Sequence, residues 1–397
     1  MMRYNNYLRG MLIRNLLFLS FLLALASCGG DSESPVEKPL LPAPTGPYTV
    51  GVKYGELADA SRPEELTRDT GDHRRFMLQV FYPSQAAANC RMLTAPFPDS
   101  IRKKFPGGFY HHCIDAPPLQ SDTTFPIIIF SPGFGGSYLN SVSLAEELAS
   151  HGYVVMYLGH PYFNDLPTFN DGKEIKAFSM DTLKMPGGVF DDKVKEMLGK
   201  YFRIEARDIL SLVPALQHNI ILREIKMDVK NIAVIGYSGG GAAGMIAASK
   251  DPADIKAVFN LDGILYGFSA SDSLKVPVFY LHSDLDYREA EYTAMNGGPD
   301  VYNKIIAYYK SQDSLAQQNS SSDYYELSIP HSLHTDFSDE AFVYEDSIRV
   351  KMIYGFKKSI AKYSVEFFDK YLRGTDSLSG KLNAGKEGKD PVLRKKR

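Results

Sequence analysis

The pentapeptide Gly236-Tyr237-Ser238-Gly239-Gly240 fits the pattern G-x-S-x-G. The apolar stretch IAVIGY leads into it and small, helix-compatible residues follow, which is the context that this motif requires. On such a sharp strand-to-helix turn the serine hydroxyl projects toward substrate, and glycines two residues to either side leave room for the strand and helix to approach. The pattern predicts that Ser238 is a nucleophile. The alternative is a glycine-rich turn in which Ser238 only caps a helix.

A serine nucleophile needs a general base, and in hydrolases with this motif the acid and the histidine follow the serine along the chain. Three histidines come after Ser238, namely His282, His331 and His334. His282 ends an apolar stretch, where a packed or hydrogen-bonded core histidine is the ordinary interpretation. His331 and His334 both follow the stretch YYELSIP, so the residue types leave either of them as the base.

The acid of such a site orients the imidazole and stabilises its cation. Two loops offer candidates, with Asp262 at the end of KAVFNLDG and Asp284 or Asp286 after VFYLHS. Aspartates at strand ends are also common turn formers. The choice between the two loops therefore stays open on residue types alone.

Two backbone amides are candidates for binding the oxyanion of a tetrahedral intermediate. One belongs to Gly239, directly after the serine, and the other to Phe134 in SPGFGG, whose glycines allow the main chain to turn an amide inward. The glycine-rich segment is not a phosphate loop, because no Lys-Ser or Lys-Thr pair follows it. Together these residues predict acyl transfer through an acyl-enzyme, and no cofactor and no metal ion are expected.

Alternating strands and helices are expected to position these residues. Period-two alternation predicts antiparallel strands at 48–58 and 75–82. Short apolar stretches alternating with helical ones predict an α/β architecture, with a mainly parallel central sheet and helices on both faces. Together with the motif at Ser238, this architecture is the one expected of an α/β-hydrolase fold. The expected strands are FPIIIFS, YVVMYLGH, IAVIGYS, KAVFNLDG, VPVFYLHSD and YYELSIP, and the expected helices lie near 141–150, near 200–219, from Gly239, and up to Gly374.

These elements make one catalytic domain over residues 48–375. Its stretch 163–192 is long for a plain connection and is a candidate lid. The lysine-rich end, residues 376–397, is expected to be disordered. The formal net charge is -3, with both signs scattered along the chain, which excludes the basic stripe of a nucleic-acid-binding protein.

The first 27 residues have the pattern of a signal peptide, with arginines before the apolar run LLFLSFLLALA. That run is shorter than the about 20 residues needed to cross a bilayer. The sequence LASC ending at Cys28 resembles a bacterial lipobox, whose cysteine becomes the first mature residue and carries diacylglycerol. An ordinary signal peptide with an incidental cysteine is the alternative. Residues 28–47 are polar and proline-rich and suit a tether, so we expect a lipid anchor on a bacterial membrane, on its periplasmic or cell-surface side.

Two further cysteines, Cys90 and Cys113, remain as a pair in an oxidising compartment. Such a pair indicates one disulfide. The alternative is a metal site formed by Cys113 with His111 and His112. Zinc sites usually show a second paired spacing, which is lacking here, so the disulfide is the prediction.

Four segments between Pro126 and Gly374 resemble the platelet-activating factor acetylhydrolase family of α/β hydrolases. FSPGFGGS is similar to the family's FSHGLG oxyanion loop, LASHGYVVMYLGH to its LASHG segment, strand and terminal histidine, and GYSGGG to its nucleophile turn. HTDFSD, which starts at His334, is similar to the family's H-x-x-F-x-D pattern. The resemblance implies ester hydrolysis, with His334 rather than His331 as the base.

The resemblance also implies the acid, because the family takes it from a Leu-Asp pair after the nucleophile helix. Leu261-Asp262 fits that position, so Asp262 is expected rather than Asp286. The sequence departs from the family at Pro132, where histidine is usual, and at Gly239, where a bulky residue is frequent. These departures alter the expected shape of the pocket.

The expected function is that of a serine ester hydrolase, a carboxylesterase or phospholipase similar to the acetylhydrolases, acting on a small-molecule or lipid ester. Bacterial relatives of the family include broad esterases and polyester-degrading enzymes. The alternatives are therefore a polyesterase or a peptidase of the same fold, and a catalytically inactive, surface-anchored binding protein.

Overall fold

The computed structural model describes residues 41–85, 90, 110–136, 140–164, 169–178, 192–218, 222–284, 298–344, 347–378 and 392–396. The expected signal peptide, Cys28, most of the tether and Asp286 lie outside the described residues. Within the described ranges, every helix is too short or too polar to cross a bilayer.

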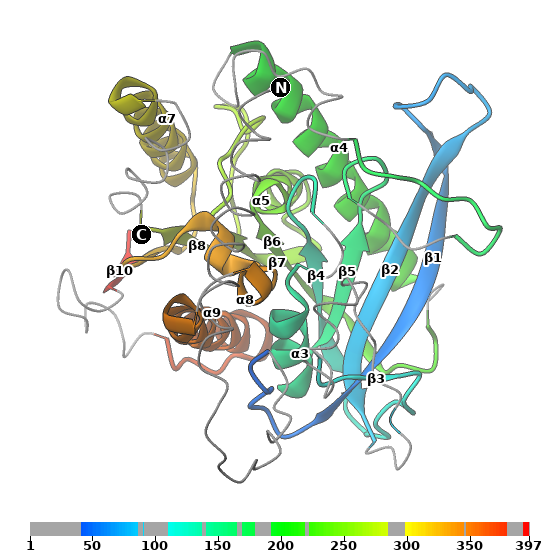
Figure 1. The fold of residues 1–397 in the computed structure, drawn as a ribbon. Coiled ribbons are helices and arrows are strands. Elements are labelled where there is room, and N and C mark those ends of the chain that lie inside the picture. Colours follow the sequence, from blue (N-terminus) through cyan, green and yellow to red (C-terminus); the bar gives the residue numbers. More distant parts are fainter. Residues whose placement is uncertain are drawn as a thin grey trace, which may run out of the picture. The chain divides into compact units, whose positions relative to one another are not determined.

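Ten strands form one sheet in the described part of the chain (Figure 1). They are β1 (Thr49–Pro63), β2 (His73–Ser84), β3 (Cys113–Ile114), β4 (Phe125–Ser131), β5 (Val154–Gly159), β6 (Met227–Tyr237), β7 (Ile255–Leu261), β8 (Val278–Ser283), β9 (Tyr324–Ile329) and β10 (Val392–Lys395). Their order across the sheet is β10-β9-β8-β7-β6-β4-β5-β2-β1-β3.

Strands β5, β4, β6, β7, β8 and β9 pair in parallel, which makes the centre of the sheet parallel. Antiparallel pairs lie toward its two sides, where β1 pairs with β2, β2 with β5, and β10 with β9. The mainly parallel central sheet expected from the sequence is confirmed.

Burial on both faces explains why the central strands are continuous apolar runs. In β4 all seven residues are buried. Ile128 and Phe130 belong to one hydrophobic core, and Ile127 and Ile129 belong to another. Successive side chains of a strand point to opposite faces, so the sheet separates two cores.

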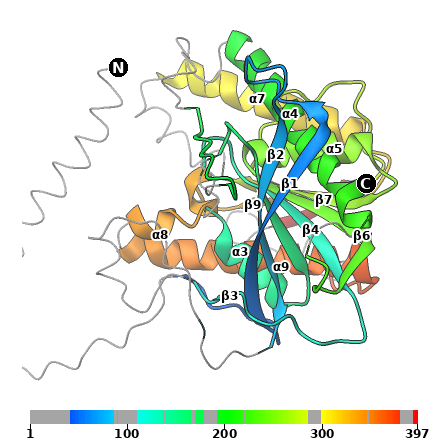
Figure 2. The same ribbon diagram turned by 90° about the vertical axis from the view of Figure 1, so that its right-hand side faces the viewer.

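Helices cover both faces of the sheet, as Figure 2 shows. They are α3 (Val142–Ser150), α4 (Asp192–Gln217), α5 (Gly239–Lys250), α7 (Gly298–Gln318), α8 (Ala341–Tyr344) and α9 (Ser347–Arg373). Residues of α3 and α9 belong to the core that contains Ile128. Residues of α4, α5 and α7 belong to the core that contains Ile127.

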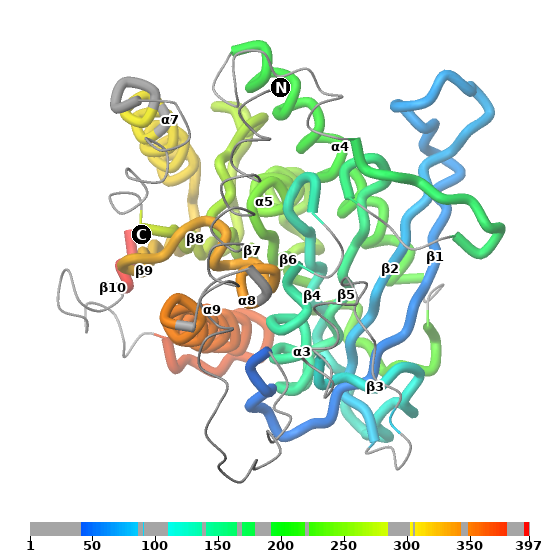
Figure 3. Tube along the Cα trace, viewed as in Figure 1, coloured from blue at the N-terminus to red at the C-terminus, as the bar shows by residue number. Residues whose placement is uncertain are grey.

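The prediction of a disordered tail over 376–397 is wrong for residues 392–395. These residues form β10, which pairs with β9 beside it in the sheet (Figure 3). Leu393 is buried in the core. The Nζ atom of Lys395 lies 2.6 Å from a carboxylate oxygen of Asp323, and that of Lys396 lies 2.8 Å from one of Glu326. One apolar side chain and two ion pairs therefore order a segment whose composition is otherwise basic.

The predicted disulfide is confirmed, because Cys90 and Cys113 are bonded, with their Cα atoms 5.1 Å apart. The bond occupies the thiol that the alternative metal site would need. His112, buried next to it, places Nδ1 2.7 Å from a carboxylate oxygen of Glu146. The disulfide joins Cys90 to β3 at the edge of the sheet.

Candidate active site

Ser238, His334 and Asp262 come together at the carboxyl ends of the central strands. His334 Nε2 lies 3.0 Å from Ser238 Oγ, and His334 Nδ1 lies 2.7 Å from Asp262 Oδ2. The three residues come from the turn after β6, the turn after β7 and the loop after β9. This continuous chain of hydrogen bonds is the arrangement by which an imidazole can take a proton from a serine hydroxyl.

The backbone at Ser238 has φ 54° and ψ -123°, a conformation that residues other than glycine rarely adopt. The glycines on either side permit it. A Cβ added at Gly236 would lie 2.2 Å from the carbonyl oxygen of Gly240, and one at Gly240 would lie 2.1 Å from that of Ser131. The turn between β6 and α5 therefore needs glycine at both positions, and it holds Ser238 at the N-terminus of α5.

Asp262 lies directly after β7, is 1% exposed and receives several hydrogen bonds. The amide of Ser283 donates to its Oδ1 over 3.0 Å, and the Ser283 hydroxyl donates to its Oδ2 over 2.6 Å. The Tyr309 hydroxyl donates to Oδ1 over 2.9 Å. These donors and His334 fix the orientation of a buried carboxylate, which would otherwise be costly to desolvate.

Ser283 and Tyr309 are residues that the sequence analysis misses. Ser283 lies at the end of the expected strand VFYLHS, but nothing in its local pattern indicates that it contacts Asp262. Tyr309 belongs to α7, in a segment where no helix is expected and where the family resemblance offers no counterpart. The abundance of tyrosine around this segment is the one signal that could have directed attention to it.

Tyr309→Phe tests the support of Asp262 by removing one hydrogen bond and keeping the ring. We expect kcat for ester hydrolysis to fall about tenfold, since a hydrogen bond to a charged group contributes about 1.5–3 kcal/mol and the other donors remain. Steady-state kinetics measure this effect. Tyr308→Phe, one residue earlier on α7, is the matched control, and an equal loss in both variants would contradict a role specific to Tyr309.

The other two aspartates considered for the acid are Asp284 and Asp286. Asp284 Oδ2 accepts a hydrogen bond of 2.7 Å from the amide of His331, so this carboxylate contacts the turn after β9. Asp286 lies outside the described residues. Of the candidate acids in the described part of the chain, Asp262 is the one hydrogen-bonded to His334.

The segment HTDFSD anchors His334 through the residues that follow it. Phe337 is buried in the core. Asp339 accepts a hydrogen bond of 2.8 Å from the amide of Ser143 in α3, and its Oδ1 lies 2.8 Å from the Nζ of Lys357 in α9. The loop that carries the histidine is thereby tied to two helices.

His334 is also held from the side of β6. The ring of Tyr237 stacks on its imidazole, with centroids 5.0 Å apart, and the Tyr237 hydroxyl donates to the carbonyl of His334 over 3.0 Å. His331 lies three residues earlier, exposed and with a φ of 63°. His282 is buried on β8 and its ring contacts Tyr280 and Tyr309.

The glycine-rich loop after β4 lies against the turn that carries Ser238. A Cβ added at Gly133 would lie 3.3 Å from the Cβ of Ser238, and one at Gly239 would lie 3.1 Å from the Cβ of Phe134. The amide of Gly239 is the first of α5, so it has no carbonyl one turn earlier in the helix. The structure thus brings both candidate oxyanion donors, Phe134 and Gly239, next to Ser238.

Aromatic rings surround this loop. Phe134 lies with its ring centroid 5.6 Å from that of Phe163, 6.0 Å from that of Tyr201 and 6.2 Å from that of Phe202. Phe202 also explains the departure at Gly239, because a Cβ there would lie 2.6 Å from Cε1 of Phe202. A ring from α4 therefore occupies the space that a bulky side chain after the serine would need.

The candidate lid, 163–192, is described in part. Residues 165–168 and 179–191 lie outside the described residues. Phe178 stacks on Tyr162, with ring centroids 5.6 Å apart, and its ring lies near those of Phe163 and Tyr201. Phe178 of this segment thus packs on the aromatic rings around the loop after β4.

A buried hydrogen-bond chain supports the start of the same loop. Ser131 Oγ lies 2.8 Å from His160 Nε2, and His160 Nδ1 lies 2.9 Å from Asp208 Oδ2. The guanidinium of Arg74 donates to Asp208 Oδ2 over 2.7 Å and to a carboxylate oxygen of Glu64 over 2.9 Å. Ser131 is the last residue of β4, so the chain fixes the point from which the loop departs.

Neighbouring charges and burial set the protonation states of His160 and Asp208 in this hydrogen-bond chain. Burial alone would raise the pKa of Asp208, but the Arg74 guanidinium and the hydrogen bond to His160 together outweigh burial and hold that pKa well below its usual range. Burial lowers the pKa of His160, although its hydrogen bond to Asp208 opposes this change. His160 is therefore neutral at pH 7 and Asp208 is ionised.

The lowered pKa of His160 predicts a pH-dependent stability. Unfolded histidine has a pKa of about 6.5. Below that pH His160 is protonated in the unfolded chain but stays neutral in the folded protein. The contribution of neutral His160 to the free energy of unfolding is therefore present above about pH 6.5 and is lost as the pH falls toward the folded pKa. We expect the free energy of unfolding to decrease between about pH 7 and pH 5, by at most about 1.4 kcal/mol per pH unit from this residue.

Urea unfolding of the unmodified protein and of His160→Gln, at several pH values in this range, measures the effect. Glutamine keeps a donor and an acceptor but does not titrate. The variant should lose less stability on acidification than the unmodified protein. An equal loss in the two proteins would show that another group is responsible.

Comparison with known proteins shows similarity to esterases. A family model described as platelet-activating factor acetylhydrolase, isoform II, matches residues 34–163. A probable 1-alkyl-2-acetylglycerophosphocholine esterase of Arthroderma benhamiae is 28% identical over 270 residues, which is 61% of this chain. Platelet-activating factor acetylhydrolase of Cavia porcellus is 25% identical over 303 residues, or 70% of this chain. The matches span 64% of the length of each of these two relatives.

Among solved structures, a ferulic acid esterase of Streptomyces cinnamoneus has a similar fold, with a TM-score of 0.65 and 21% sequence identity. The match covers 90% of this chain and 99% of that structure. With the parallel sheet and the strand-to-helix turn at Ser238, the chain shares the fold of that esterase, and parts of its sequence are similar to platelet-activating factor acetylhydrolases.

Proposed function

We propose that this protein is a carboxylic ester hydrolase in which Ser238 is the nucleophile, His334 the general base and Asp262 the acid of the triad. The observation that carries the proposal is the hydrogen-bond chain from Ser238 Oγ through both ring nitrogens of His334 to Asp262. The backbone conformation of Ser238 and the esterase relatives support it.

In the proposed mechanism, His334 Nε2 takes the proton of Ser238 as Oγ attacks the acyl carbonyl carbon. The amides of Phe134 and Gly239 donate to the oxyanion of the tetrahedral intermediate. The C–O bond of the ester breaks, and His334 returns the proton to the leaving alcohol. Water, deprotonated by the same histidine, then attacks the acyl-enzyme and releases the carboxylic acid. Asp262 remains ionised and stabilises the imidazolium.

The proposed substrates are small-molecule or lipid esters with an apolar acyl group. The ring of Phe202 and the Cβ of Phe134 lie beside Gly239, so an acyl group bound to Ser238 would meet an apolar surface. Nitrophenyl esters of graded acyl length test this proposal in a turnover assay. We expect saturable hydrolysis of at least one of them. Failure to hydrolyse any ester in the series would favour the inactive binding protein.

Asp262→Asn tests the assignment of the acid. An amide keeps the shape of the side chain but does not stabilise the imidazolium and favours the wrong tautomer of His334, so kcat should fall by about 10⁴-fold. Asp286→Asn, in the competing loop, should retain most of the turnover. A large loss of kcat in Asp286→Asn with little loss in Asp262→Asn would show that Asp286 is the acid.

We further propose that Cys28 is lipidated after removal of residues 1–27 and that the tether holds the enzyme at a membrane on the periplasmic or cell-surface side. The support is the lipobox-like sequence before Cys28. Diacylglycerol and a further acyl chain, at about 0.8 kcal/mol per buried methylene, give lasting attachment. Metabolic labelling with a fatty acid should be lost in Cys28→Ala, and labelling that persists would contradict this proposal.

A further inference from the structure

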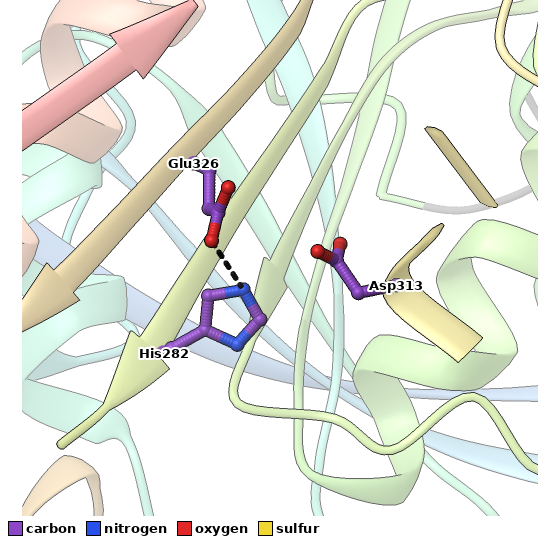
Figure 4. Close-up of side chains that lie close together, drawn as sticks. All are labelled: His282, Asp313 and Glu326. Atoms are coloured by element: carbon purple, nitrogen blue, oxygen red, sulfur yellow. Dashed lines mark ion pairs between the residues drawn. The ribbon is translucent and has the colours of Figure 1, made fainter. Parts of the chain in front are cut away.

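A second group of ionisable side chains lies behind the acid of the proposed triad. It consists of His282 on β8, Asp313 on α7 and Glu326 on β9, whose side chains converge in Figure 4. One ligand atom from each residue lies within 4.8 Å of the others. No part of the proposed ester hydrolysis uses these residues.

His282 is the unusual member of this group. Its residue is 5% exposed, and within the described part of the chain neither ring nitrogen has a hydrogen-bond partner. The sequence predicts a packed or hydrogen-bonded histidine, and the structure shows packing against Tyr280 and Tyr309. Buried polar groups normally have partners, because a lost one costs about 1–3 kcal/mol. The ring is directed toward Glu326 and Asp313 (Figure 4).

We propose that His282, Asp313 and Glu326 bind a divalent transition-metal ion of the Zn²⁺ type. An imidazole nitrogen and two carboxylate oxygens form a ligand set that such ions accept, and water can complete the coordination. A buried imidazole with two carboxylates is less suited to Ca²⁺ or Mg²⁺, which prefer oxygen ligands alone.

The surroundings of the two carboxylates resemble the outer hydrogen bonds that orient metal ligands. The Tyr324 hydroxyl donates to Asp313 Oδ1 over 2.6 Å. Lys396 lies 2.8 Å from Glu326 Oε2, while Oε1 of the same carboxylate lies 4.0 Å from His282 Nε2. Each carboxylate thus has one oxygen held by a neighbour and a second oxygen available to an ion.

The spacing of the three ligand atoms is close to what one ion requires. In a tetrahedral zinc site with bonds of about 2.1 Å, ligand atoms are about 3.4 Å apart. The three ligand atoms lie within 4.8 Å of one another, so the most distant pair needs to close by up to about 1.4 Å, which rotation of the two carboxylate side chains can supply. The Glu326 side chain is 24% exposed, so an ion has access from solvent.

A protonated His282 paired with both carboxylates is the competing interpretation. The 4.0 Å between Nε2 and Glu326 Oε1 exceeds the about 3.2 Å of a hydrogen bond, so such an ion pair would leave the ring donors unsatisfied. A metal ion instead uses a ring nitrogen as a ligand. Zinc titration separates the two interpretations.

A bound ion would join β8, α7 and β9 next to the residues that hold Asp262. His282 immediately precedes Ser283, and Asp313 lies one helical turn after Tyr309 on α7. Ser283 and Tyr309 both donate to Asp262. The ion would therefore act as a structural cross-link between β8, α7 and β9. Its binding does not depend on Ser238 being catalytic.

The experiment uses the full chain, purified without a polyhistidine tag, treated with EDTA and dialysed into chelator-free buffer. Titration with ZnCl₂ in a calorimeter should show one tight site, and one equivalent should raise Tm. Asp313→Asn and Glu326→Gln, which preserve side-chain shape, should each lower the affinity at least tenfold and abolish the increase in Tm. His282→Gln should do the same, and the two carboxylate variants decide the result if this variant does not fold.

Asp323→Asn is the matched control. It neutralises a carboxylate directly before β9 that pairs with Lys395 of β10, but it leaves the three proposed ligands unchanged. It should bind zinc as the unmodified protein does. The proposal is overturned if no single tight site is found, or if the site keeps its affinity in Asp313→Asn and Glu326→Gln. Equal losses in these variants and in Asp323→Asn would also overturn it, because docking of the C-terminal strand would then explain the effect.

Discussion

Ser238→Ala is expected to lower kcat for ester hydrolysis by about 10⁵- to 10⁶-fold, leaving only the contribution of substrate binding and the oxyanion donors. The hydroxyl is the atom that forms the acyl-enzyme, so no neighbouring group replaces it. Steady-state turnover of the best nitrophenyl ester measures the loss.

The Ser238→Ala variant should keep its fold. At a φ of 54° the backbone strain is about the same for alanine as for serine. The backbone amide at position 238, which donates to the carbonyl of Leu261 over 2.9 Å, is unchanged by the substitution. Circular dichroism and thermal unfolding check this point. A folded variant that retains a tenth or more of the turnover would show that another residue is the nucleophile.

His334→Ala is expected to cause a loss of similar size, because serine is a weak nucleophile until its proton is removed. His331→Ala is the matched control and should stay within about fivefold of the unmodified enzyme. Kinetics of the two variants at the same pH make the comparison. A larger loss of kcat in His331→Ala than in His334→Ala would show that His331 is the base.

The double variant Ser238→Ala, His334→Ala should be no slower than Ser238→Ala alone. The two residues act as one unit in the proposed mechanism, so removing the second group has little left to change. An additive loss, in which the two single effects multiply, would mean that the histidine acts in a step that does not involve the serine.

The central strands could be predicted because burial on both faces leaves a strong local pattern. β4, for example, is a continuous apolar run that ends in a glycine-rich turn. β10 could not be predicted, since a short strand within a basic tail depends on acidic partners such as Asp323 and Glu326 that lie far away in the sequence. The helix α7 could not be predicted for a related reason, because the contact of Tyr309 with Asp262 leaves no local signal.

Some residues of the candidate site could likewise be predicted from local sequence, and others could not. Ser238 is marked by its own neighbours, but the residue types leave both the base and the acid open, and the family resemblance was needed to choose His334 and Asp262. The contacts of Ser283 and Tyr309 with Asp262, and the chain from Ser131 to Arg74, join residues from separate elements. Pairings of this kind are a property of the fold, so they require a structure.

Reaction with a fluorophosphonate followed by peptide mapping tests the central claim most directly, because this reagent reports an activated serine without any assumption about the natural substrate. The account predicts one adduct per chain, on the peptide that contains Ser238, and loss of labelling in Ser238→Ala. An adduct on a different serine, or labelling that persists in Ser238→Ala, would contradict it.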